Sequence, residues 1–304
     1  MRAFDISEEY DTPVLLRTTT RVNHGKSVVR LAEPREPVAG RFQRDTCKYV
    51  MIPAYATKRH VIVEERLARL SELAETTDLN RVEWADTSVG VITSGISYQY
   101  VKDAMPNASI LKLGLTWPLP RKLIVDFASK VGTLYVVEEL DPFLENEILS
   151  MGIAVIGKER FPICGELNPM LVARGFGLEV SPEEPLPAPV PPRPPVLCAG
   201  CPHRGFYHVL KKLNAIVTGD IGCYTLGVLP PLETMDTCVC MGASIGNALG
   251  MKRSQTPEDK RPVVAVIGDS TFVHSGITGL VDAVYNNTAA TVCILDNSTT
   301  AMTG

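Results

Sequence analysis

The second half of the chain alternates short apolar runs with amphipathic stretches. Continuous apolar runs predict three strands, at 215–218, 263–267 and 291–295. Amphipathic stretches predict three helices, at 209–213, 242–253 and 276–285. Uninterrupted apolar strands are typical of a parallel sheet that helices cover on both faces. The order of these elements therefore predicts a doubly wound α/β domain over residues 196–304.

Residues 86–180 repeat the same alternation. Apolar runs predict strands at 89–95, 109–113, 133–140 and 153–157. The stretches between them predict helices at 97–104, 120–130 and 145–150. A segment rich in Glu, Arg, Leu and Ala at 57–79 is typical of an exposed amphipathic helix. We therefore expect a second small parallel-sheet domain over 57–180, with this helix leading into it.

A proline-rich segment separates the two predicted domains. Residues 181–195 read SPEEPLPAPVPPRPP, with eight prolines among fifteen residues. Proline has no N–H to donate and a fixed φ angle, so neither a helix nor a central strand fits here. An extended polyproline linker is the natural interpretation. The predicted fold class is thus α/β, with two doubly wound parallel-sheet domains joined by a Pro-rich linker.

The start of the chain has a different character. It contains one clear strand, TPVLLRTT at 12–19, and then His24. No apolar segment upstream of this strand could bury it. We therefore expect residues 1–56 to be the remnant of a further domain and its connector, with the beginning of that domain absent.

Composition narrows the class of protein. Hydrophobic residues make up 45% of the chain and charged residues 21%, as in ordinary globular proteins. The net charge of −4 and the isoelectric point near 5.8 give no basic footprint for nucleic acid or an anionic membrane. No apolar run approaches the ~18–20 residues of a membrane span, and the first residues lack the apolar core of a signal peptide. Eight cysteines in such a chain favour a reducing compartment, so we expect a cytoplasmic protein.

Two predicted strands end at residues that suit a hard metal ion. The strand at 263–267 runs into Gly268-Asp269-Ser270, and the strand at 291–295 runs into Asp296-Asn297. Parallel strands place these ends on one edge of the sheet, where α/β folds bind ligands. The Asp269 carboxylate, the Asn297 amide oxygen and the main-chain carbonyl near Thr299 suit Mg²⁺, which takes further ligands from phosphate and water. A Mg²⁺-bridged diphosphate fits this edge, although Gly-Asp alone is also common in loops after strands.

Three segments together resemble the thiamine diphosphate signature. That signature usually reads Gly-Asp-Gly, some two dozen residues, and then Asn-Asn or Asp-Asn; Ser270 replaces the third glycine here, as the oxidoreductase branch tolerates. TGDIGCYTLG at 218–227 and MGASIGNALG at 241–250 resemble its other diphosphate- and pyrimidine-side elements. The resemblance implies that the cofactor contacts Gly219, Asp220, Ile221, Gly222, Gly242, Ala243, Ser244, Gly268, Asp269, Ser270, Asn297 and Thr299.

The cysteines add a possible metal site. Cys198 and Cys201 form a Cys-x-x-Cys pair, whose two thiolates can meet one metal centre, and Cys223 follows within GDIGC. The arrangement resembles the proximal 4Fe-4S site of 2-oxoacid:ferredoxin oxidoreductases, in which a fourth cysteine comes much later in the chain. Structural zinc and free thiols packed against the linker remain alternatives. Further candidate ligands, none of which the resemblance favours, are Cys238, Cys240, His203 and His208.

Over nearly its whole length, the chain resembles the large (alpha) subunits of the indolepyruvate ferredoxin oxidoreductase family. The segments that carry the resemblance are 7–24, 90–101, 111–120, 136–148, 197–210, 219–227 and 295–304. It implies oxidative decarboxylation of an aryl 2-oxoacid such as indolepyruvate to an acyl-CoA, an EC 1.2.7-class reaction. The implied cofactors are thiamine diphosphate, Mg²⁺ and a 4Fe-4S cluster, with coenzyme A as co-substrate. The implied partners are ferredoxin and a beta subunit in a hetero-oligomer.

The family plan also assigns the domains. It implies that 1–56 is the remnant of a pyrimidine-binding domain, that 57–180 is a transketolase C-terminal-like domain and that 196–304 is the thiamine diphosphate-binding domain. Most of the pyrimidine domain, its activating glutamate, the final strands of the diphosphate domain and a ferredoxin-type tail are missing. We therefore expect a C-terminally truncated fragment that is inactive alone. Glu138 and Glu139 end a strand of the middle domain, and we interpret them as structural or interface charges rather than as the activating carboxylate.

The resemblance also implies a substrate side near the first strand. Arg17, Thr18 and His24 follow or end that strand, where the family places groups near the substrate carboxylate. A guanidinium suits a carboxylate because it donates paired hydrogen bonds. An exposed strand end without this role is the alternative.

Two other functions remain open. One is a non-redox thiamine diphosphate decarboxylase or synthase of the acetolactate type, which shares Gly-Asp…Asn but has no need of the cysteines. The other is a truncated subunit that needs partner chains or does nothing alone.

Overall fold

The computed structural model describes residues 2–34, 36, 42–180, 191 and 194–298. The chain divides into two compact units, Met1–Glu184 and Pro185–Gly304, called unit 1 and unit 2 below. The division falls within the proline-rich segment, most of which lies outside the described residues. In the described part of the chain, no helix is long and apolar enough to cross a membrane.

Unit 1 is built around a four-stranded sheet with the order β1-β3-β2-β4. Its strands are β1 (Arg81–Glu83), β2 (Asp86–Ser94), β3 (Ala108–Leu113) and β4 (Thr133–Val137). β2 pairs in parallel with both β3 and β4, whereas the short edge strand β1 runs antiparallel to β3. The predicted α/β fold is confirmed, and the antiparallel edge strand is an addition that the sequence pattern did not reveal.

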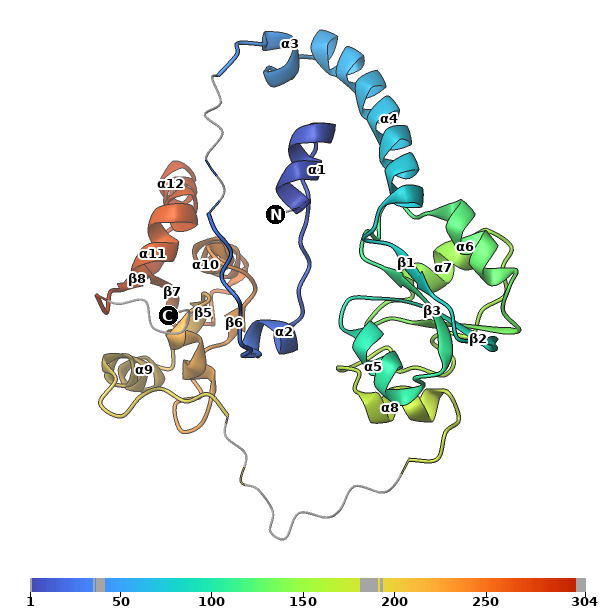
Figure 1. The fold of residues 1–304 in the computed structure, drawn as a ribbon. Helices are drawn as coiled ribbons and strands as arrows, with labels where there is room; N and C mark the ends of the chain where they lie inside the picture. Colours follow the sequence, from blue (N-terminus) through green and yellow to red (C-terminus); the bar gives the residue numbers. More distant parts are fainter. Residues whose placement is uncertain (1, 35, 37–41, 181–190, 192–193, 299–304) are drawn as a thin grey trace. The chain divides into compact units, whose positions relative to one another are not determined.

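Helices cover both faces of the unit 1 sheet (Figure 1). Side chains of α5 (Ser97–Ala104) and α8 (Pro169–Gly175) form one core with Val91 and Ile110. Side chains of α6 (Arg121–Ala128) and α7 (Phe143–Ser150) form a second core with Ile92 and Leu111 on the opposite face. This double burial explains why the central strands read as continuous apolar runs.

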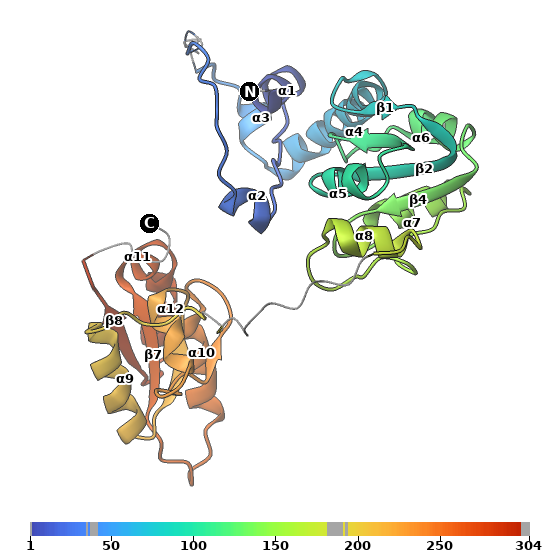
Figure 2. The ribbon, with the colours of Figure 1, turned by 60° about the horizontal axis from the view of Figure 1, so that its bottom comes forward.

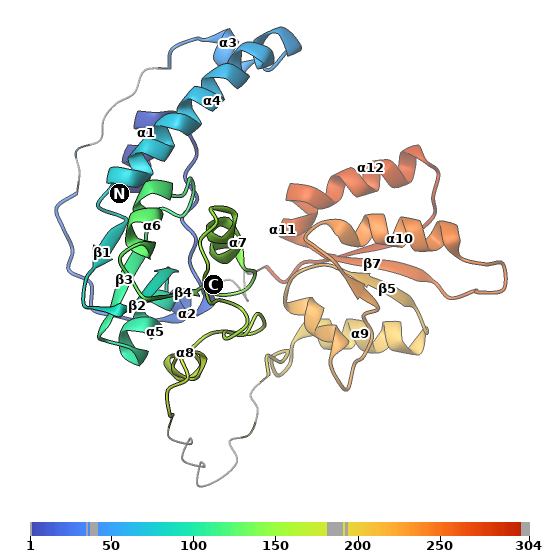
Figure 3. The same cartoon turned by 90° about the vertical axis from the view of Figure 1, so that its right-hand side faces the viewer.

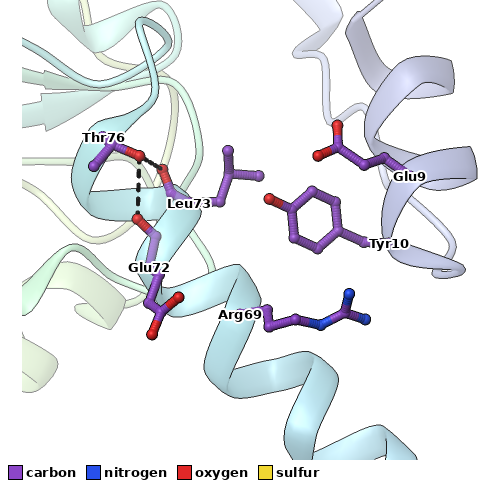
Figure 4. A pocket seen from close by; sticks show the side chains of 6 residues that line it. All are labelled: Glu9, Tyr10, Arg69, Glu72, Leu73 and Thr76. Carbon is purple, nitrogen blue, oxygen red and sulfur yellow. Dashed lines mark hydrogen bonds between the residues drawn. The ribbon is translucent and has the colours of Figure 1, made fainter.

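The N-terminal part of unit 1 is joined to the long helix α4 (Pro53–Thr76) by ion pairs and one aromatic contact. It contains α1 (Arg2–Tyr10), α2 (Thr20–His24) and α3 (Thr46–Tyr49). The Asp11 carboxylate lies 2.6 Å from Lys48 and 3.2 Å from Arg59, and the Lys48 ammonium above all holds the pKa of Asp11 below its usual range. Figure 4 shows α1 facing α4 across a cavity of about 420 Å³, with the Arg69 guanidinium 5.7 Å from the ring centroid of Tyr10.

Unit 2 has a four-stranded, fully parallel sheet with the order β6-β5-β7-β8. Its strands are β5 (Ile216–Gly219), β6 (Thr237–Cys238), β7 (Val263–Gly268) and β8 (Thr291–Leu295). α9 (Pro202–Lys212) covers one face, while α10 (Ala243–Ser254) and α12 (Ile277–Tyr285) cover the other (Figure 2, Figure 3). Short helical turns lead away from two strands: η1 (Cys223–Val228), α11 (Asp269–Thr271) and η2 (Phe272–Gly276).

Two predicted strands do not form. Residues 12–19 form no strand and pair with no strand among the described residues, and Leu15 and Leu16 remain 95% and 81% exposed. The prediction of a strand at 153–157 was also wrong: only Ile156 reaches the sheet, through a single bridge to Tyr135. Both segments show the apolar pattern, but a strand also needs its N–H and C=O groups paired along its length. At 153–157 only Ile156 makes such bonds, to Leu134 and Val136 of β4.

Candidate functional site

The carboxyl edge of the unit 2 sheet gathers the predicted acidic residues. Asp220 follows β5, Asp269 follows β7, and Asp296 and Asn297 follow β8. Because all four strands are parallel, these positions share one edge of the sheet. The register pairs Gly268 with Leu295, so the residues after β7 and β8 leave the sheet at the same level.

This edge also contains a topological switch point. β5 and β7 are neighbours, but the chain after β5 leaves toward the face covered by α9, and the chain after β7 leaves toward the face covered by α12. A crevice opens where adjacent strands send their connections to opposite faces, and α/β folds place ligands there. Asp220 and Asp269 flank this point.

Asp220 is completely buried, and its carboxylate binds backbone N–H groups of the chain. Its carboxylate accepts hydrogen bonds from the N–H of Ile221 and Gly242, both at 2.9 Å, and of Ser244 at 3.3 Å. It therefore caps the start of α10 and ties the loop after β5 to it. The predicted cofactor contacts through Gly219–Gly222 and Gly242–Ser244 stay a prediction, and several N–H groups of these segments already donate within the chain.

Glycine is required at two positions of these loops. Gly242 has a φ of +87°, in the left-handed region, and a Cβ placed on it would lie 2.4 Å from the Ser275 hydroxyl oxygen. A Cβ placed on Gly222 would lie 2.4 Å from the Tyr224 ring. These glycines therefore let α10 and the η1 turn approach their neighbours closely.

Tyr224 joins the loops after β5 and β7, and sequence reasoning missed it. Its hydroxyl accepts a hydrogen bond from the Gly268 N–H at 3.0 Å and donates one to the Ile221 carbonyl at 3.0 Å. Burial raises the pKa of Tyr224, so the phenol stays protonated and keeps its donor. The signal in the sequence was a single aromatic residue among the three glycines of GDIGCYTLG.

Several buried polar atoms of α10 and β6 lack a hydrogen-bond partner among the described residues. The Ser244 hydroxyl and the Asn247 amide nitrogen of α10, together with the Thr237 hydroxyl of β6, are buried and make no hydrogen bond to any residue that the structure describes. Buried polar groups are almost always paired, so unpaired ones call for an explanation such as a ligand or water. Ser244 belongs to the predicted cofactor set, and its free hydroxyl is compatible with a polar group bound next to α10.

The predicted magnesium ligands are only partly described. Asp269 is exposed at the start of α11, directly after β7, with Ser270 next to it. Asn297 is half-buried and makes contacts of its own, whereas Thr299 lies outside the described residues. The assignment of Asp269, Asn297 and Thr299 to Mg²⁺ therefore stays a prediction, and the fit rests on one carboxylate and one amide at one sheet edge.

The three predicted cluster cysteines lie on neighbouring segments. The Cys201 N–H donates to the Cys198 carbonyl at 3.1 Å, and this turn ends at Cys201, directly before α9. Cys223 begins η1, and the ring centroids of His203 and Tyr224, close to Cys201 and Cys223 in sequence, are 6.1 Å apart. All three thiols are free. Among the described residues, however, no three His, Cys, Asp or Glu side chains are close enough to hold one metal ion, and the cluster stays a prediction.

The histidines near the cysteines differ in environment. His203 is buried against Tyr224, and burial lowers its pKa below the usual range. His208 is exposed on α9, one turn further along. Cys238 of β6 is half-buried, with its thiol 3.6 Å from the Asp220 carbonyl, and burial raises its pKa, which favours the neutral thiol over a ligating thiolate.

The residues predicted for the substrate side belong to unit 1. Arg17 lines a cavity at the edge of the unit 1 sheet. The Thr18 hydroxyl donates to the Asn23 side chain at 3.0 Å, and His24 is the exposed last residue of α2. Of the three, only Arg17 thus lines that cavity, and their substrate role stays a prediction.

Glu138 and Glu139 hold backbone groups. The Glu138 carboxylate accepts from the N–H of Leu144 at 2.9 Å and of Glu145 at 3.0 Å, which caps the start of α7. The Glu139 carboxylate accepts from the Leu167 N–H at 3.0 Å. Burial raises the pKa of Glu138, and the two N–H bonds oppose that shift. These contacts agree with the interpretation of both residues as structural charges.

The chain is similar in sequence to known proteins over nearly its whole length. Residues 220–304 match the family described as "Thiamine pyrophosphate enzyme, C-terminal TPP binding domain". The chain is 39% identical over 327 residues to "Indolepyruvate oxidoreductase subunit IorA" of Archaeoglobus fulgidus, and the match covers 99% of this chain and 52% of that protein. The protein of the same name from Methanothermobacter marburgensis is 40% identical over 331 residues, which covers 99% of this chain and 53% of that protein.

The chain therefore spans about half the length of these relatives. Among solved structures, it is similar to the 2-oxoglutarate:ferredoxin oxidoreductase from Magnetococcus marinus, with 19% identity and a TM-score of 0.33 over 41% of this chain and 23% of that chain. A similarity at this level supports no further inference. The sequence matches are consistent with the thiamine diphosphate signature at the carboxyl edge of unit 2.

Proposed function

We propose that this homologue of the indolepyruvate oxidoreductase IorA subunits binds thiamine diphosphate with Mg²⁺ at the carboxyl edge of unit 2. The observation that carries the proposal is the geometry of the switch point between β5 and β7. There Asp269 is exposed and available as a ligand, while the buried Asp220 and Tyr224 fix the loops around it. The match of residues 220–304 to a thiamine diphosphate-binding domain supports the same location.

The residues at this edge would have three different roles, as metal ligands, as a cofactor contact and as a positioning residue. Asp269 and the Asn297 amide would supply oxygen ligands to Mg²⁺, and the Thr299 carbonyl is proposed as a third. The Ser244 hydroxyl, which has no partner among the described residues, would bind a polar group of the cofactor. Asp220 keeps α10 and the loop after β5 in register, so it acts as a positioning residue. When bound, the thiamine supplies the carbanion chemistry that removes CO₂ from a 2-oxoacid.

The whole enzyme would be an EC 1.2.7-class oxidoreductase. Its substrate would be an aryl 2-oxoacid such as indolepyruvate, with coenzyme A as co-substrate and ferredoxin as electron acceptor. Cys198, Cys201 and Cys223 would supply three thiolates to a 4Fe-4S cluster, and a beta subunit would complete a hetero-oligomer. The names of the relatives, each a subunit of an indolepyruvate oxidoreductase, support this assignment. A cytoplasmic location belongs to the same proposal.

A non-redox thiamine diphosphate decarboxylase or synthase is the second candidate. It would use the same edge of unit 2 and would leave the cysteines without a role. Anaerobic reconstitution with iron and sulfide separates the two. The oxidoreductase proposal expects bound iron with visible absorbance near 400 nm, lost in Cys201→Ser, whereas a colourless protein with titratable thiols at 198 and 201 would favour the non-redox enzyme.

The binding proposal is tested by titrating thiamine diphosphate into the purified chain with and without Mg²⁺. We expect Mg²⁺-dependent binding that Asp269→Asn weakens by about 100-fold, because the substitution removes the charged metal ligand. Asp259→Asn is the matched control, since Asp259 is an acid of the loop that precedes β7, at the opposite edge of the sheet. Equal affinity of wild type and Asp269→Asn, or binding without Mg²⁺, would contradict the proposed site.

A further inference from the structure

A second cavity lies at the carboxyl edge of the other sheet, in unit 1. Its volume is about 580 Å³, within the usual range for small-molecule sites. The walls come from the loops after β2, β3 and β4, represented by Gly95, Gly114 and Leu140, and from Leu16 and Arg17 of the N-terminal segment. The cavity belongs to unit 1 alone and does not depend on the thiamine site.

The cavity occupies the switch point of the unit 1 sheet. β2 and β3 are neighbours, but the loop after β2 enters α5 on one face and the loop after β3 leads to α6 on the opposite face. The connections diverge at this point and leave a crevice outside the strand ends, where α/β sheets bind ligands. Gly95 lies in this crevice with a φ of +58°, and a Cβ placed on it would meet no atom within 4 Å.

Two buried polar side chains, Asn80 behind the crevice and Glu138 in its lining, hold its loops in place. The Asn80 amide oxygen accepts from the N–H of Gly114 and Leu115, both at 2.9 Å, and its nitrogen donates to the Ala74 carbonyl at 2.9 Å. The Glu138 carboxylate fixes the loop after β4 in the same way, through the N–H of Leu144. The loops are therefore pre-organised, which lowers the entropic cost of binding a ligand.

Among the described residues, two cations of the crevice, Lys112 and Arg17, form no ion pair. The Glu83 carboxylate, which acts on Lys112 from a distance, pairs with Lys102 instead at 3.1 Å, and burial lowers the pKa of Lys112. A Cβ placed on Gly114 would lie 3.1 Å from the Lys112 Nζ, which places the ammonium over the loop after β3. Arg17 lines the same wall. The carboxylates of Glu138 and Glu139 also face this region but accept from backbone N–H groups, which leaves Asp141 as the exposed acid of the lining.

Apolar side chains complete the lining. Phe143 is 45% exposed at the start of α7, and its ring centroid lies 6.1 Å from that of Trp117, which lies in the loop after β3. Leu140 and Ile96 line the crevice from the other two loops. An apolar wall beside an unpaired ammonium suits a molecule with an anionic head and an apolar body.

We propose that the crevice of unit 1 is a second ligand site, which binds a small organic carboxylate or phosphate ester through Lys112 and places its apolar part against Phe143. The proposal extends beyond the thiamine site, because it uses no residue of unit 2. The two anionic heads share one chemistry, and the choice of probe distinguishes them.

Trp117 provides the readout. The chain contains two tryptophans, so Trp84→Phe leaves Trp117 as the single reporter, excited where phenylacetate does not absorb. Phenylacetate and inorganic phosphate are titrated separately into this background. We expect saturable quenching or enhancement with phenylacetate, weakened about tenfold by Lys112→Gln, because a charge-assisted contact is lost. Lys122→Gln on the exposed surface of α6 is the matched control and should bind as the background does.

The two titrations distinguish the possible ligands and can overturn the proposal. Saturation by phosphate alone with the same Lys112 dependence assigns the site to phosphate esters, and saturation by phenylacetate assigns it to carboxylates. Equal affinity of Lys112→Gln and the background overturns the proposal, as does the absence of saturation by both probes. Asp269→Asn distinguishes the two proposals, because it should weaken thiamine diphosphate binding by about 100-fold and leave phenylacetate binding unchanged. Unaltered thermal unfolding of Lys112→Gln confirms that a lost signal is lost binding.

Discussion

The two sheets of this chain share an architecture and differ in what their carboxyl edges contain. Both have four strands, a switch point between two central strands and helices on both faces. At the unit 1 edge, Lys112, which forms no ion pair with a described residue, lines an open cavity, and the Glu138 and Glu139 carboxylates accept hydrogen bonds from backbone N–H groups. At the unit 2 edge, Asp269 is exposed, and the glycine-rich loops close around Tyr224.

This difference shows how two sheets of the same architecture can suit ligands in two ways, either by direct contact with an anion or through a metal ion. The Lys112 ammonium can contact an anion directly, whereas an edge that carries Asp269 first needs a divalent cation before it can hold a diphosphate. In each unit, a fully or largely buried polar residue, Asn80 or Asp220, shapes the loops without facing the ligand. The positioning residues are therefore the places where the two sites can be disrupted one at a time.

The largest effect is expected from Asp220→Ala. The substitution leaves the N–H groups of Ile221, Gly242 and Ser244 without their acceptor in a buried place. We expect it to destabilise unit 2 by about 3–5 kcal/mol, since several charge-assisted hydrogen bonds are lost together. Hydrogen exchange followed by mass spectrometry should show faster exchange over 216–254 with no change over 86–137. If the variant and the wild type exchanged at the same rates in both segments, Asp220 would not stabilise unit 2 as the account requires.

Asn80→Ala is the corresponding test in unit 1. The change removes the acceptor of the Gly114 and Leu115 N–H groups and the donor to the Ala74 carbonyl. We expect a loss of about 2–3 kcal/mol in unit 1, measured by urea unfolding with tryptophan fluorescence, because both tryptophans lie in that unit. Asn146→Ala, an exposed position on α7, serves as the control. A variant that unfolds like the wild type would show that the loop after β3 does not need Asn80.

Tyr224→Phe should have a smaller effect confined to unit 2. It removes one hydroxyl and leaves the Gly268 N–H unpaired at a buried position. The expected cost is about 1–2 kcal/mol, accompanied by weaker thiamine diphosphate binding, because Gly268 precedes Asp269. Tyr285→Phe on the exposed side of α12 is the matched control. Exchange of the amides at 268–271 as slow as in the wild type would rule out this role.

The smallest predicted effect is a pH dependence of unit 1. The hydroxyl of Tyr98, followed by Lys102 and Arg81, lowers the pKa of Glu83 from its usual 4.5 to about 2. A carboxyl with a lower pKa in the folded state contributes stability that is fully present above pH 4.5 and is lost as the pH falls toward 2. Urea unfolding at several pH values should show this loss, and Glu83→Gln should remove that part of it. A profile with the same slope in the variant would assign the dependence to other groups.

The sequence predicted most of the fold because its signals were local. Apolar runs such as Val263–Gly268 are buried on both faces, and the helix after Gly242 begins one residue from its expected start. The failures depend on partners distant in the chain. The extended segment 12–19 finds no strand to pair with, and β1 joins the sheet edge in an antiparallel direction without any apolar pattern of its own.

The candidate site was predictable in its chemistry and less so in its geometry. The acid after each strand was visible in the order of Gly-Asp and Asp-Asn motifs. The sequence could not reveal that Asp220 turns inward to cap α10 while Asp269 stays exposed, because that depends on which N–H groups the folded loops leave unpaired. The unit 1 crevice was missed for a similar reason, since Lys112 and Arg17 are far apart in the chain.

The most direct test of the account is hydrogen exchange of the purified chain with thiamine diphosphate and Mg²⁺ added together. The account predicts slower exchange in the segments 219–225, 242–247 and 268–272 of unit 2, with no change at 94–97 and 112–116 of unit 1. Mg²⁺ alone should have little effect, because the metal needs phosphate oxygens to complete its coordination. Protection of the unit 1 segments, or none in either unit, would contradict the assignment of thiamine diphosphate to the edge that carries Asp269.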